Sequence, residues 1–355
     1  MLFRSALGLA IPLVTAISTT LAAKNGLLVR ERMALESARN IDVVLFDKTG
    51  TLTKGEQGVV DILAKDKGRT LSLAAALERE SEHPIAKAIF QYAHGQNVPE
   101  THATDFSALS GRGVRAKAGG KMVYVGGPRL LEELKLKLDS ELQKAAEEAS
   151  TDGKTVVYVV EDKTVLGAIM LADVIREESK EAVARLHDMG KRVAMLTGDS
   201  KGVAAWVAKE LGIKEYFAEV LPENKAETVK KLQADGSRVA MVGDGVNDAP
   251  ALTQANIGIA IGAGTDVAIE SAGIVLASSD PRGVAKIVTL SKATYRKMLQ
   301  NLAWATGYNA LAIPLAAGVT SGIGFVLSPA LGAVLMSLST IIVAINAQLL
   351  RRIKL

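Results

Sequence analysis

The longest uncharged apolar stretches of the sequence lie near its two ends. They are Ala6–Ala23, Leu299–Val319 and Ile323–Leu350. A helix needs about 20 mostly apolar residues to cross a bilayer, so we expect three transmembrane helices. The last two would form a hairpin around the turn Thr320-Ser321-Gly322. For the first run a buried core helix remains an alternative, whereas a signal peptide is disfavoured because no small-residue cleavage site follows.

The region between these runs alternates between short apolar stretches and helix-like ones. The apolar stretches are Val43–Phe46, Thr155–Val160, Val193–Leu196, Arg238–Val242, Ile257–Ile261 and Ile274–Leu276. Helical patterns between them cover Glu177–Asp188, Gly202–Leu211 and Lys225–Ala234. Continuous apolar strands that alternate with helices are typical of a parallel sheet covered on both faces.

Residues 56–168 break this rhythm with a helix pair over Thr70–His94 and Gly-rich hairpins. We therefore expect an α/β domain into which a second, α+β domain is inserted. The expected parts are a transmembrane helix with a cytoplasmic extension over 1–37, the α/β domain over 38–55 and 169–291, the insertion over 56–168, and two transmembrane helices over 292–355.

Composition and charge support a membrane location over nucleic-acid binding. The 355 residues carry 42 Lys and Arg against 38 Asp and Glu, a formal net charge of +4. Residues 38–291 nevertheless hold 32 basic and 36 acidic residues, so the excess of base flanks the apolar ends. Lys and Arg mark the cytoplasmic side of membrane helices, and a nucleic-acid protein would cluster them on its folded domain. The absence of Cys excludes a disulfide scaffold, a zinc finger and thiol catalysis.

A carboxylate stands at the end of the first predicted strand, in the segment I-D-V-V-L-F-D-K-T-G-T-L-T. Sites in open α/β sheets form at the carboxyl ends of strands, where Asp47 would be presented. Such a carboxylate can attack a phosphorus atom and form an aspartyl-phosphate. A lone Asp in this position is more often a turn residue, so the interpretation depends on the motifs that follow.

Three further motifs supply what phosphoryl transfer to a carboxylate needs. They are V-A-M-L-T-G-D-S with Thr197, Gly198 and Asp199, L-P-E-N-K with Lys225, and V-A-M-V-G-D-G-V-N-D-A-P with Asp244 and Asp248. Together they provide a donor to the phosphoryl oxygens, a cation for developing charge, and carboxylates for magnesium. Four such motifs in this order are a specific combination.

The D-K-T-G-T-L-T, T-G-D and G-D-G-V-N-D-A-P motifs resemble those of P-type ATPases, within the haloacid-dehalogenase-like superfamily. The resemblance implies a Rossmannoid phosphorylation domain with an inserted nucleotide-binding domain, and Asp47 as the phosphorylated residue. It implies that Thr197 and Lys225 contact the phosphoryl group and that Asp47, the Thr49 carbonyl and Asp244 hold Mg²⁺, while Asp248 supports the loop. Lys48, Gly198 and Asp199 belong to the same motifs and are expected to face the cofactor.

Thr49 stands where many soluble phosphatases of this superfamily have an Asp that acts as general acid-base. Rapid hydrolysis of an aspartyl-phosphate therefore lacks its usual base here. A long-lived intermediate suits a pump, which must couple that intermediate to movement.

Ser81-Glu82-His83-Pro84 resembles the nucleotide-domain signature of heavy-metal, or type IB, pumps. The resemblance implies that His83 lies near the adenine of ATP and that Glu78 contacts the edge of the base. Glycines that would let the backbone approach the nucleotide are Gly111, Gly113, Gly126 and Gly127. Turns need glycine in any case, and a His-Pro pair can be an ordinary helix cap, so neither feature is decisive alone.

Polar groups inside the predicted spans indicate the transported ion. Tyr308-Asn309 and Met336-Ser337 lie within the second and third spans, where polar side chains are costly and usually functional. Methionine sulfur suits Cu⁺ or Ag⁺. These segments look like the last two helices of copper-transporting members, so we expect Cu⁺ or Cu²⁺, although lipid-facing Met336 remains an alternative.

The sequence departs from the family in two respects. Phe3-Arg4-Ser5 occupies the place of the Cys-Pro metal motif, and no Thr-Gly-Glu tripeptide occurs. We therefore expect the C-terminal half of a multi-pass cell-membrane pump with cytoplasmic catalytic domains, which a second polypeptide would complete. Two alternatives are a membrane-tethered phosphatase of the same superfamily and a non-enzymatic fragment that assembles with a full-length pump.

Overall fold

The computed structural model describes residues 6–79, 81, 83–244, 246–262, 266–319, 322 and 328–355. It divides into two compact units, each formed from separate stretches of the chain. The first unit combines Met1–Asp47, Glu181–Ala194 and Pro222–Leu355, and the second combines Lys48–Lys180 and Met195–Leu221. The chain passes from one unit to the other directly after Asp47.

A sheet of short buried strands lies at the centre of the first unit. Strand β11 pairs in parallel with β2 and β12, β12 pairs in parallel with β13, and β1 adds an antiparallel edge. The order is β1-β13-β12-β11-β2-β9-β10, where β10 is the short strand Glu215–Phe217. Every residue of β2, β11, β12 and β13 is buried. This confirms the predicted parallel sheet, with one correction: the apolar run Thr155–Val160 lies in an antiparallel strand of the second unit, because its partners are the neighbouring hairpin strands. Its strands are β1 (Leu27–Val29), β2 (Val43–Asp47), β9 (Arg192–Leu196), β11 (Val239–Gly243), β12 (Ile257–Ile261) and β13 (Ile274–Leu276).

Short helices connect these strands, close to where the sequence predicts them. The predicted helix Glu177–Asp188 is α8, and the one from Lys225 ends at Gln233. The others in this part are α3 (Arg32–Ser37), η1 (Ala38–Asn40), η3 (Pro222–Asn224), α10 (Lys225–Gln233), η4 (Val246–Asp248), α11 (Ala249–Gln254) and α12 (Asp266–Ser271).

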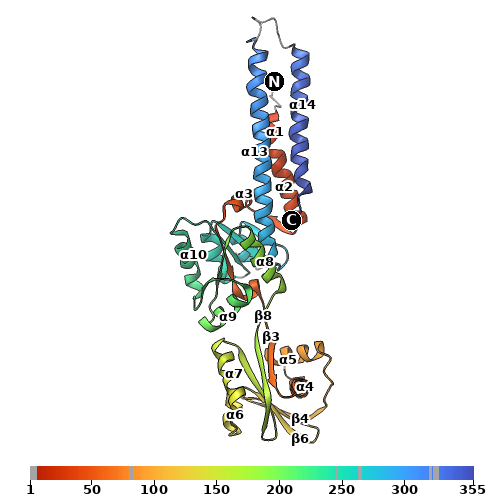
Figure 1. The fold of residues 1–355 in the computed structure, drawn as a ribbon, viewed down its shortest axis with the longest axis vertical. Coiled ribbons are helices and arrows are strands. Elements are labelled where there is room, and N and C mark those ends of the chain that lie inside the picture. Colours follow the sequence, from red (N-terminus) through yellow and green to blue (C-terminus); the bar gives the residue numbers. More distant parts are fainter. Residues whose placement is uncertain are drawn as a thin grey trace. The chain divides into compact units, whose positions relative to one another are not determined.

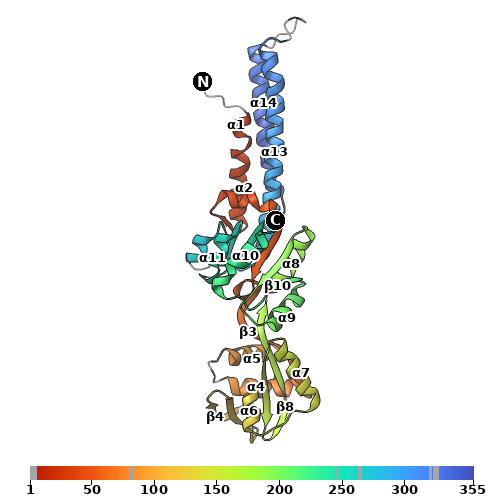
Figure 2. The same ribbon diagram turned by 90° about the vertical axis from the view of Figure 1, so that its left-hand side faces the viewer.

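The remaining helices of the first unit come from the apolar ends of the chain, and Figures 1 and 2 show α13 and α14 running side by side. The first apolar run is broken into two helices, because Pro12 has no N–H to continue the first of them. The helix that carries the second run begins at Arg282, well before its apolar part. These helices are α1 (Ala6–Ala10), α2 (Pro12–Lys24), α13 (Arg282–Ala316), α14 (Pro329–Gln348) and η6 (Leu349–Arg352).

Among the described helices, one is long and apolar enough to cross a membrane by itself, over Pro329–Arg352. Gly8–Lys24, which joins the end of α1 to α2, is a shorter apolar stretch of helix. In α13 the apolar half also carries Asn301, Tyr308 and Asn309, which lower its hydropathy. Thr320 and Ser321 of the expected turn lie outside the described residues, so the three-span hairpin topology stays a prediction.

The second unit contains a six-stranded antiparallel sheet in the order β3-β8-β7-β6-β5-β4. Alternate residues of β7 enter different cores: Val157 and Val159 pack with α4 and α5, whereas Val156 and Val160 pack with α6 and α7. This alternation places one helix pair on each face of the sheet, as an inserted α+β domain requires. Its strands are β3 (Thr53–Ala64), β4 (Ala103–Leu109), β5 (Gly113–Ala118), β6 (Lys121–Gly126), β7 (Thr155–Glu161) and β8 (Thr164–Ile175).

The helices of the second unit include the predicted pair over Thr70–His94. That pair consists of two twelve-residue helices, separated after Glu78. The helices described in this unit are α4 (Lys67–Glu78), α5 (Pro84–Gly95), α6 (Pro128–Glu133), α7 (Ser140–Thr151) and α9 (Lys201–Leu211), with the short strand β10 (Glu215–Phe217) following α9. The segment η2 (Lys48–Leu52) is a kinked turn with non-helical backbone at Thr49 and Gly50.

Candidate active site

Lys225 lies between two aspartates at the carboxyl edge of the first unit's sheet. Its Nζ is 2.6 Å from Asp47 Oδ1 and 2.7 Å from Asp248 Oδ1. Asp47 ends the buried strand β2, Lys225 opens α10, and Asp248 lies just after β11. All three residues are buried. The fold thus brings together three residues that the sequence analysis assigned to phosphoryl transfer.

A glycine makes room for Asp248. A Cβ atom on Gly243 would lie 2.4 Å from Asp248 Oδ2 and 2.8 Å from Asp248 Cβ, closer than real Cβ atoms approach. Gly243 therefore lets the aspartate lie directly against the end of β11. Carboxylate oxygens of Asp47, Asp244 and Asp248 all lie within 4.8 Å of one another.

The charges in this cluster affect one another. Burial and the carboxylates of Asp248 and Asp244 raise the pKa of Asp47 to about 7, against the opposing effect of Lys225. Burial lowers the pKa of Lys225, but attraction to Asp47 and Asp248 outweighs that effect and holds it above its ordinary value. Among the contacts that the structure describes here, three carboxylates lie near one ammonium in a poorly hydrated place.

This donor set fits a magnesium ion. Mg²⁺ prefers oxygen ligands and is usually held by one or two carboxylates together with phosphate oxygens and water. Lys225 binds Oδ1 of Asp47 and Oδ1 of Asp248, so neither bond from the ammonium uses the Oδ2 atoms. A divalent cation at these oxygens and Asp244 would offset the charge of the carboxylates.

A second buried lysine, Lys48, forms a separate cluster within the second unit. Its Nζ is 2.6 Å from Asp199 Oδ2 and 3.1 Å from Asp173 Oδ2. Asp173 also accepts hydrogen bonds from Thr53 Oγ1 at 2.6 Å and from Gly55 N at 3.0 Å. The sequence analysis named Lys48 and Asp199 but missed Asp173. Its position near the end of β8 is the kind of strand-end signal that identified Asp47.

Thr197 and Asp199 hold each other in place. Thr197 Oγ1 donates to Asp199 Oδ2 at 3.0 Å and accepts from Asp199 N at 3.1 Å. Gly198 lies between them, where a Cβ atom would come within 3.5 Å of Val220 O. The sequence analysis also missed Thr51. Its buried Oγ1 has no hydrogen-bond partner within the part of the chain that the structure describes.

The two nucleotide candidates of the helix pair differ in exposure. Glu78 is buried at the end of α4, and burial raises its pKa to about 7, opposed by a hydrogen bond with Ser81. His83 is exposed at the start of α5, where its Nδ1 accepts a hydrogen bond from Ile85 N at 3.3 Å. The capping alternative therefore describes Nδ1, and it leaves Nε2 outside the cap.

Two of the four glycines have a structural reason within the sheet. A Cβ atom on Gly113 would lie 2.0 Å from Val125 O, and one on Gly126 would lie 2.0 Å from Arg112 O. These glycines let β5 and β6 approach closely where they pair. Gly111 has a positive φ of 68° and, like Gly127, has open space around it.

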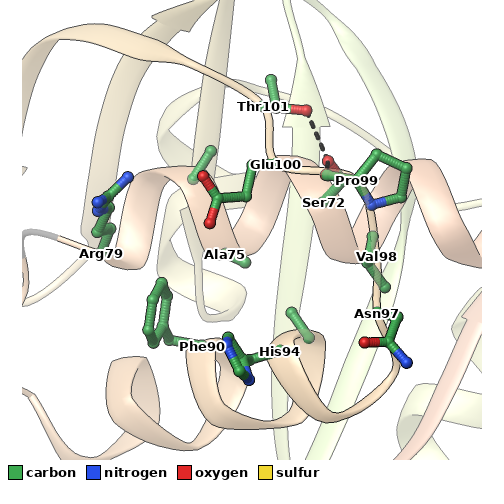
Figure 3. Close-up of a pocket in the computed structure, with 12 residues that line it drawn as sticks. Ser72, Ala75, Arg79, Phe90, His94, Asn97, Val98, Pro99, Glu100 and Thr101 are labelled. Atoms are coloured by element: carbon green, nitrogen blue, oxygen red, sulfur yellow. Dashed lines mark hydrogen bonds between the residues drawn. The ribbon is translucent and has the colours of Figure 1, made fainter.

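A cavity of about 270 Å³ opens between α4, α5 and the segment that follows α5. Figure 3 shows Arg79, Phe90, His94 and Glu100 around it, together with the hydrogen bond between Ser72 and Thr101. The residues that line it include none of the ATP candidates. This cavity therefore does not support the assignment of Glu78 and His83 to ATP binding.

The transported-metal candidates lie on α13 and α14. Tyr308 and Asn309 are half-buried, whereas Met336 and Ser337 are exposed, and Ser337 Oγ donates to Ala333 O of its own helix. Ser339, which the analysis did not select, is buried, and its Oγ has no hydrogen-bond partner among the described residues. Residues two apart on a helix lie on different faces, so Ser337 and Ser339 cannot both face the same neighbours. Considering the helix faces could therefore have identified Ser339 as a second candidate.

Comparisons with known proteins agree with this geometry. The family model of haloacid dehalogenase-like hydrolases matches residues 41–256. The solved catalytic domain of a CPx-ATPase, CopB-B, is 30% identical with a TM-score of 0.52, and the match covers 76% of this chain and 98% of that one. This chain belongs to the P-type ATPase family, within the haloacid dehalogenase-like hydrolases. The resemblance seen in the motifs is thereby confirmed.

Longer P-type ATPases match almost the whole chain. A copper-exporting P-type ATPase B of Archaeoglobus fulgidus is 56% identical over 98% of this chain, and a probable copper-transporting P-type ATPase B of Staphylococcus aureus is 48% identical over 96%. The crystal structure of a zinc-transporting PIB-type ATPase matches 97% of the chain with 35% identity and a TM-score of 0.85. The chain spans 50% and 51% of the two copper ATPases and 55% of the zinc ATPase, about half the length of each.

Proposed function

We propose that this chain carries the phosphorylation step of an ATP-driven pump for a soft heavy-metal ion, copper in the first place. The observation that supports this most directly is the cluster of Asp47, Lys225 and Asp248 at the carboxyl edge of the parallel sheet. Asp47 would be the residue that forms the aspartyl-phosphate. Ten or more motif positions of the family are intact around it.

Lys225 orients the nucleophile in this proposal. It holds Asp47 Oδ1 and leaves Oδ2 to attack the γ-phosphorus of ATP. A bond forms between Asp47 and phosphorus, the bond from phosphorus to the β,γ-bridging oxygen breaks, and ADP leaves with that electron pair. Mg²⁺, held by Asp47, the Thr49 carbonyl and Asp244, would neutralise charge on the phosphoryl oxygens. Thr49 offers no carboxylate to activate water, so the phosphorylated state should persist.

The remaining catalytic and nucleotide assignments rest on the family motifs. Thr197 would donate to a phosphoryl oxygen, in a loop that Lys48, Gly198 and Asp199 keep in shape. His83 would reach the adenine through its Nε2, and Glu78 would contact the base edge. Gly111, Gly113, Gly126 and Gly127 would line the backbone that approaches ATP.

Copper as the transported ion rests on the relatives and on the chemistry of α14. Two matching relatives are named as copper pumps, and Met336 offers a soft sulfur ligand for Cu⁺ or Ag⁺. Tyr308, Asn309 and Ser337 would complete or flank that site, and Cu²⁺ remains within the proposal. The helices would place the protein in the cell membrane as a multi-pass protein with its catalytic units in the cytoplasm.

The chain corresponds to about half the length of the copper pump of Archaeoglobus fulgidus. Transport is therefore proposed for a pump that contains both halves, and phosphorylation is proposed for the residues described here. A fragment that only assembles with a full-length pump would keep the fold but need no phosphorylation. A membrane-tethered phosphatase is disfavoured by Thr49 and would hydrolyse small phosphoesters.

Labelling with γ-labelled ATP and magnesium tests the proposal. The purified chain should acquire an acid-stable, hydroxylamine-sensitive label, and Asp47→Asn should remove it while ATP binding is retained. Asp42→Asn is the matched control, because Asp42 lies exposed before the other end of the same strand. Absence of label in parent protein that still binds ATP would contradict phosphorylation by this chain alone and favour the non-enzymatic alternative.

A further inference from the structure

A groove of about 350 Å³ lies in the first unit between α2, α3 and α13. One end of it is apolar, where Ile11, just before α2, approaches the apolar half of α13. Leu299 and Leu302 line this end and are 47% and 38% exposed, although both are large apolar side chains. Asn301 Nδ2 donates to Ala10 O at 3.2 Å, which fixes the two helices against each other there.

The opposite end of the groove is cationic. The Arg39 guanidinium lies 3.8 Å from the centroid of the Tyr295 ring, and Arg39 N donates to Ser291 Oγ at 3.0 Å. Arg32 donates to Thr15 Oγ1 at 3.1 Å and pairs with Glu36 at 2.8 Å. Glu36 thus offsets Arg32, while Arg39 forms no ion pair with a carboxylate among the described residues. The net charge at this end is positive.

The cationic end and the apolar end of the groove are arranged like the headgroup layer and the acyl chains of a bilayer. Arg296 and Lys297 are the last cations of α13 before its apolar half begins at Leu299. Tyrosine is enriched at the level of lipid headgroups, and Tyr295 stands at this boundary. With α13 inserted as the proposed function has it, the arginines face the cytoplasmic headgroup layer and the leucines face the acyl chains.

We propose that this groove binds one anionic phospholipid. Its phosphate would lie at Arg39 and Arg32, and an acyl chain would follow Leu299 and Leu302. Basic pockets between membrane helices on the cytoplasmic side are suited to anionic headgroups. An inorganic phosphate would leave the exposed apolar end uncovered, whereas a zwitterionic lipid would bring a second cation towards the arginines. The inference rests on the membrane placement of the proposed function but not on phosphorylation or copper.

Native mass spectrometry of the full chain in a neutral detergent tests this site. The chain is titrated with phosphatidylglycerol or with phosphatidylcholine, and the number and affinity of retained lipids are measured. We expect one tightly retained phosphatidylglycerol, with affinity about fivefold lower for each of Arg39→Gln and Arg32→Gln. The Arg32 side chain is 56% exposed, so its replacement should leave the fold intact. Lys24→Gln, an exposed cation at the end of α2 that does not line the groove, should behave like the parent.

Four outcomes would overturn the proposal. They are equal retention of the two lipids, unchanged phosphatidylglycerol affinity in both arginine variants, displacement by glycerol 3-phosphate at matching concentration, and loss of the lipid when the other half of a copper-pump relative is co-purified. The third would indicate a site for a soluble phosphate, and the last would indicate a protein helix in the groove. The titration uses no ATP, so an inert chain in the labelling assay would leave its result valid.

Discussion

Lys225 and Lys48 are both buried and both lie between two aspartates, but their surroundings differ. Lys225 faces Asp47 and Asp248, and the carboxylate of Asp244 lies close to both, so the ammonium is outnumbered. Lys48 faces Asp173 and Asp199. There, Thr53 and a backbone N–H share the charge of Asp173, while the Asp199 side chain is 36% exposed to water.

The comparison distinguishes the cluster for which we propose phosphoryl transfer from a cluster in which hydrogen bonds and solvent share the charge. Around Lys48 each carboxylate oxygen has a donor or solvent nearby, which satisfies a buried ion pair. Around Lys225, burial and then the carboxylate of Asp248 raise the pKa of Asp47 to about 7, against the opposing effect of Lys225. A site prepared for a magnesium ion and a phosphoryl group has such a shifted pKa before its ligands arrive.

The strongest test of the difference is Lys225→Met. Removing the ammonium leaves Asp47 and Asp248 buried with no cation, so we expect the free energy of unfolding to fall by about 3–5 kcal/mol. Urea unfolding measures this, and ATP labelling should be lost as well. Lys230→Met is the matched control, because Lys230 lies on the same helix in an exposed pair with Glu227. A parent-like urea midpoint for Lys225→Met would show that the carboxylates do not need the ammonium.

Gly243→Ala tests the position of a carboxylate in the Lys225 cluster separately from its charge. It should displace the Asp248 side chain while every charged group of the cluster remains. The new methyl group would overlap Asp248, so we expect a loss of about 1–3 kcal/mol in unfolding free energy and a clear drop in the labelling rate. Gly95→Ala, which has open space around it, should leave both quantities unchanged. Full labelling in Gly243→Ala would mean that the position of Asp248 does not matter.

Lys48→Met should cost less than Lys225→Met. Asp173 keeps its bonds from Thr53 and Gly55, and Asp199 can turn to water, so we expect a loss of about 1–2 kcal/mol. The exposed pair of Lys180 and Glu210 provides the control, since Lys180→Met should change stability by less than about 1 kcal/mol. If Lys48→Met proved as destabilising as Lys225→Met, the distinction between the two clusters would fail.

Glu78 is also buried, and its pKa is shifted by burial, with no charged group among the causes. Its folded-state pKa of about 7 lies above the ordinary 4.5, so stability should fall as pH rises from about 4.5 to about 7 and level off above that. Glu78→Gln should remove this slope and stabilise the protein by about 1–2 kcal/mol at pH 8. Urea unfolding at several pH values, beside the exposed Glu132→Gln, measures the effect. An unchanged slope in Glu78→Gln would assign it to another group.

Much of the parallel sheet could be predicted from the sequence, because its buried strands coincide with the continuous apolar runs. Strands β12 and β13 have the predicted bounds, and α8 begins and ends where its pattern does. The second unit's antiparallel sheet was expected only as an insertion, since its strand order depends on pairings between distant segments. The break before Pro12 was missed because hydropathy outweighed the proline.

The candidate site was predictable where residues follow buried strands. Asp47 and Asp248 have that position, and Lys225 was recognised from its motif. Asp173 was missed because its partner Lys48 lies 125 residues away, and no local pattern encodes that contact. Ser339 was passed over because Met336 offered more distinctive chemistry, although only the helix packing shows which hydroxyl is buried.

Helix α13 gives one further consequence. Its 35 residues correspond to about 50 Å of unbroken helix. Near its start Val284, Ala285, Ile287 and Val288 are fully buried in the core of the catalytic unit, and Pro314 is only two residues from its end. No proline lies between these buried residues and Pro314, so we expect this part of the helix to move as one rigid element. We therefore expect a tilt of α13 at its buried start to displace Tyr308 and Asn309 as well.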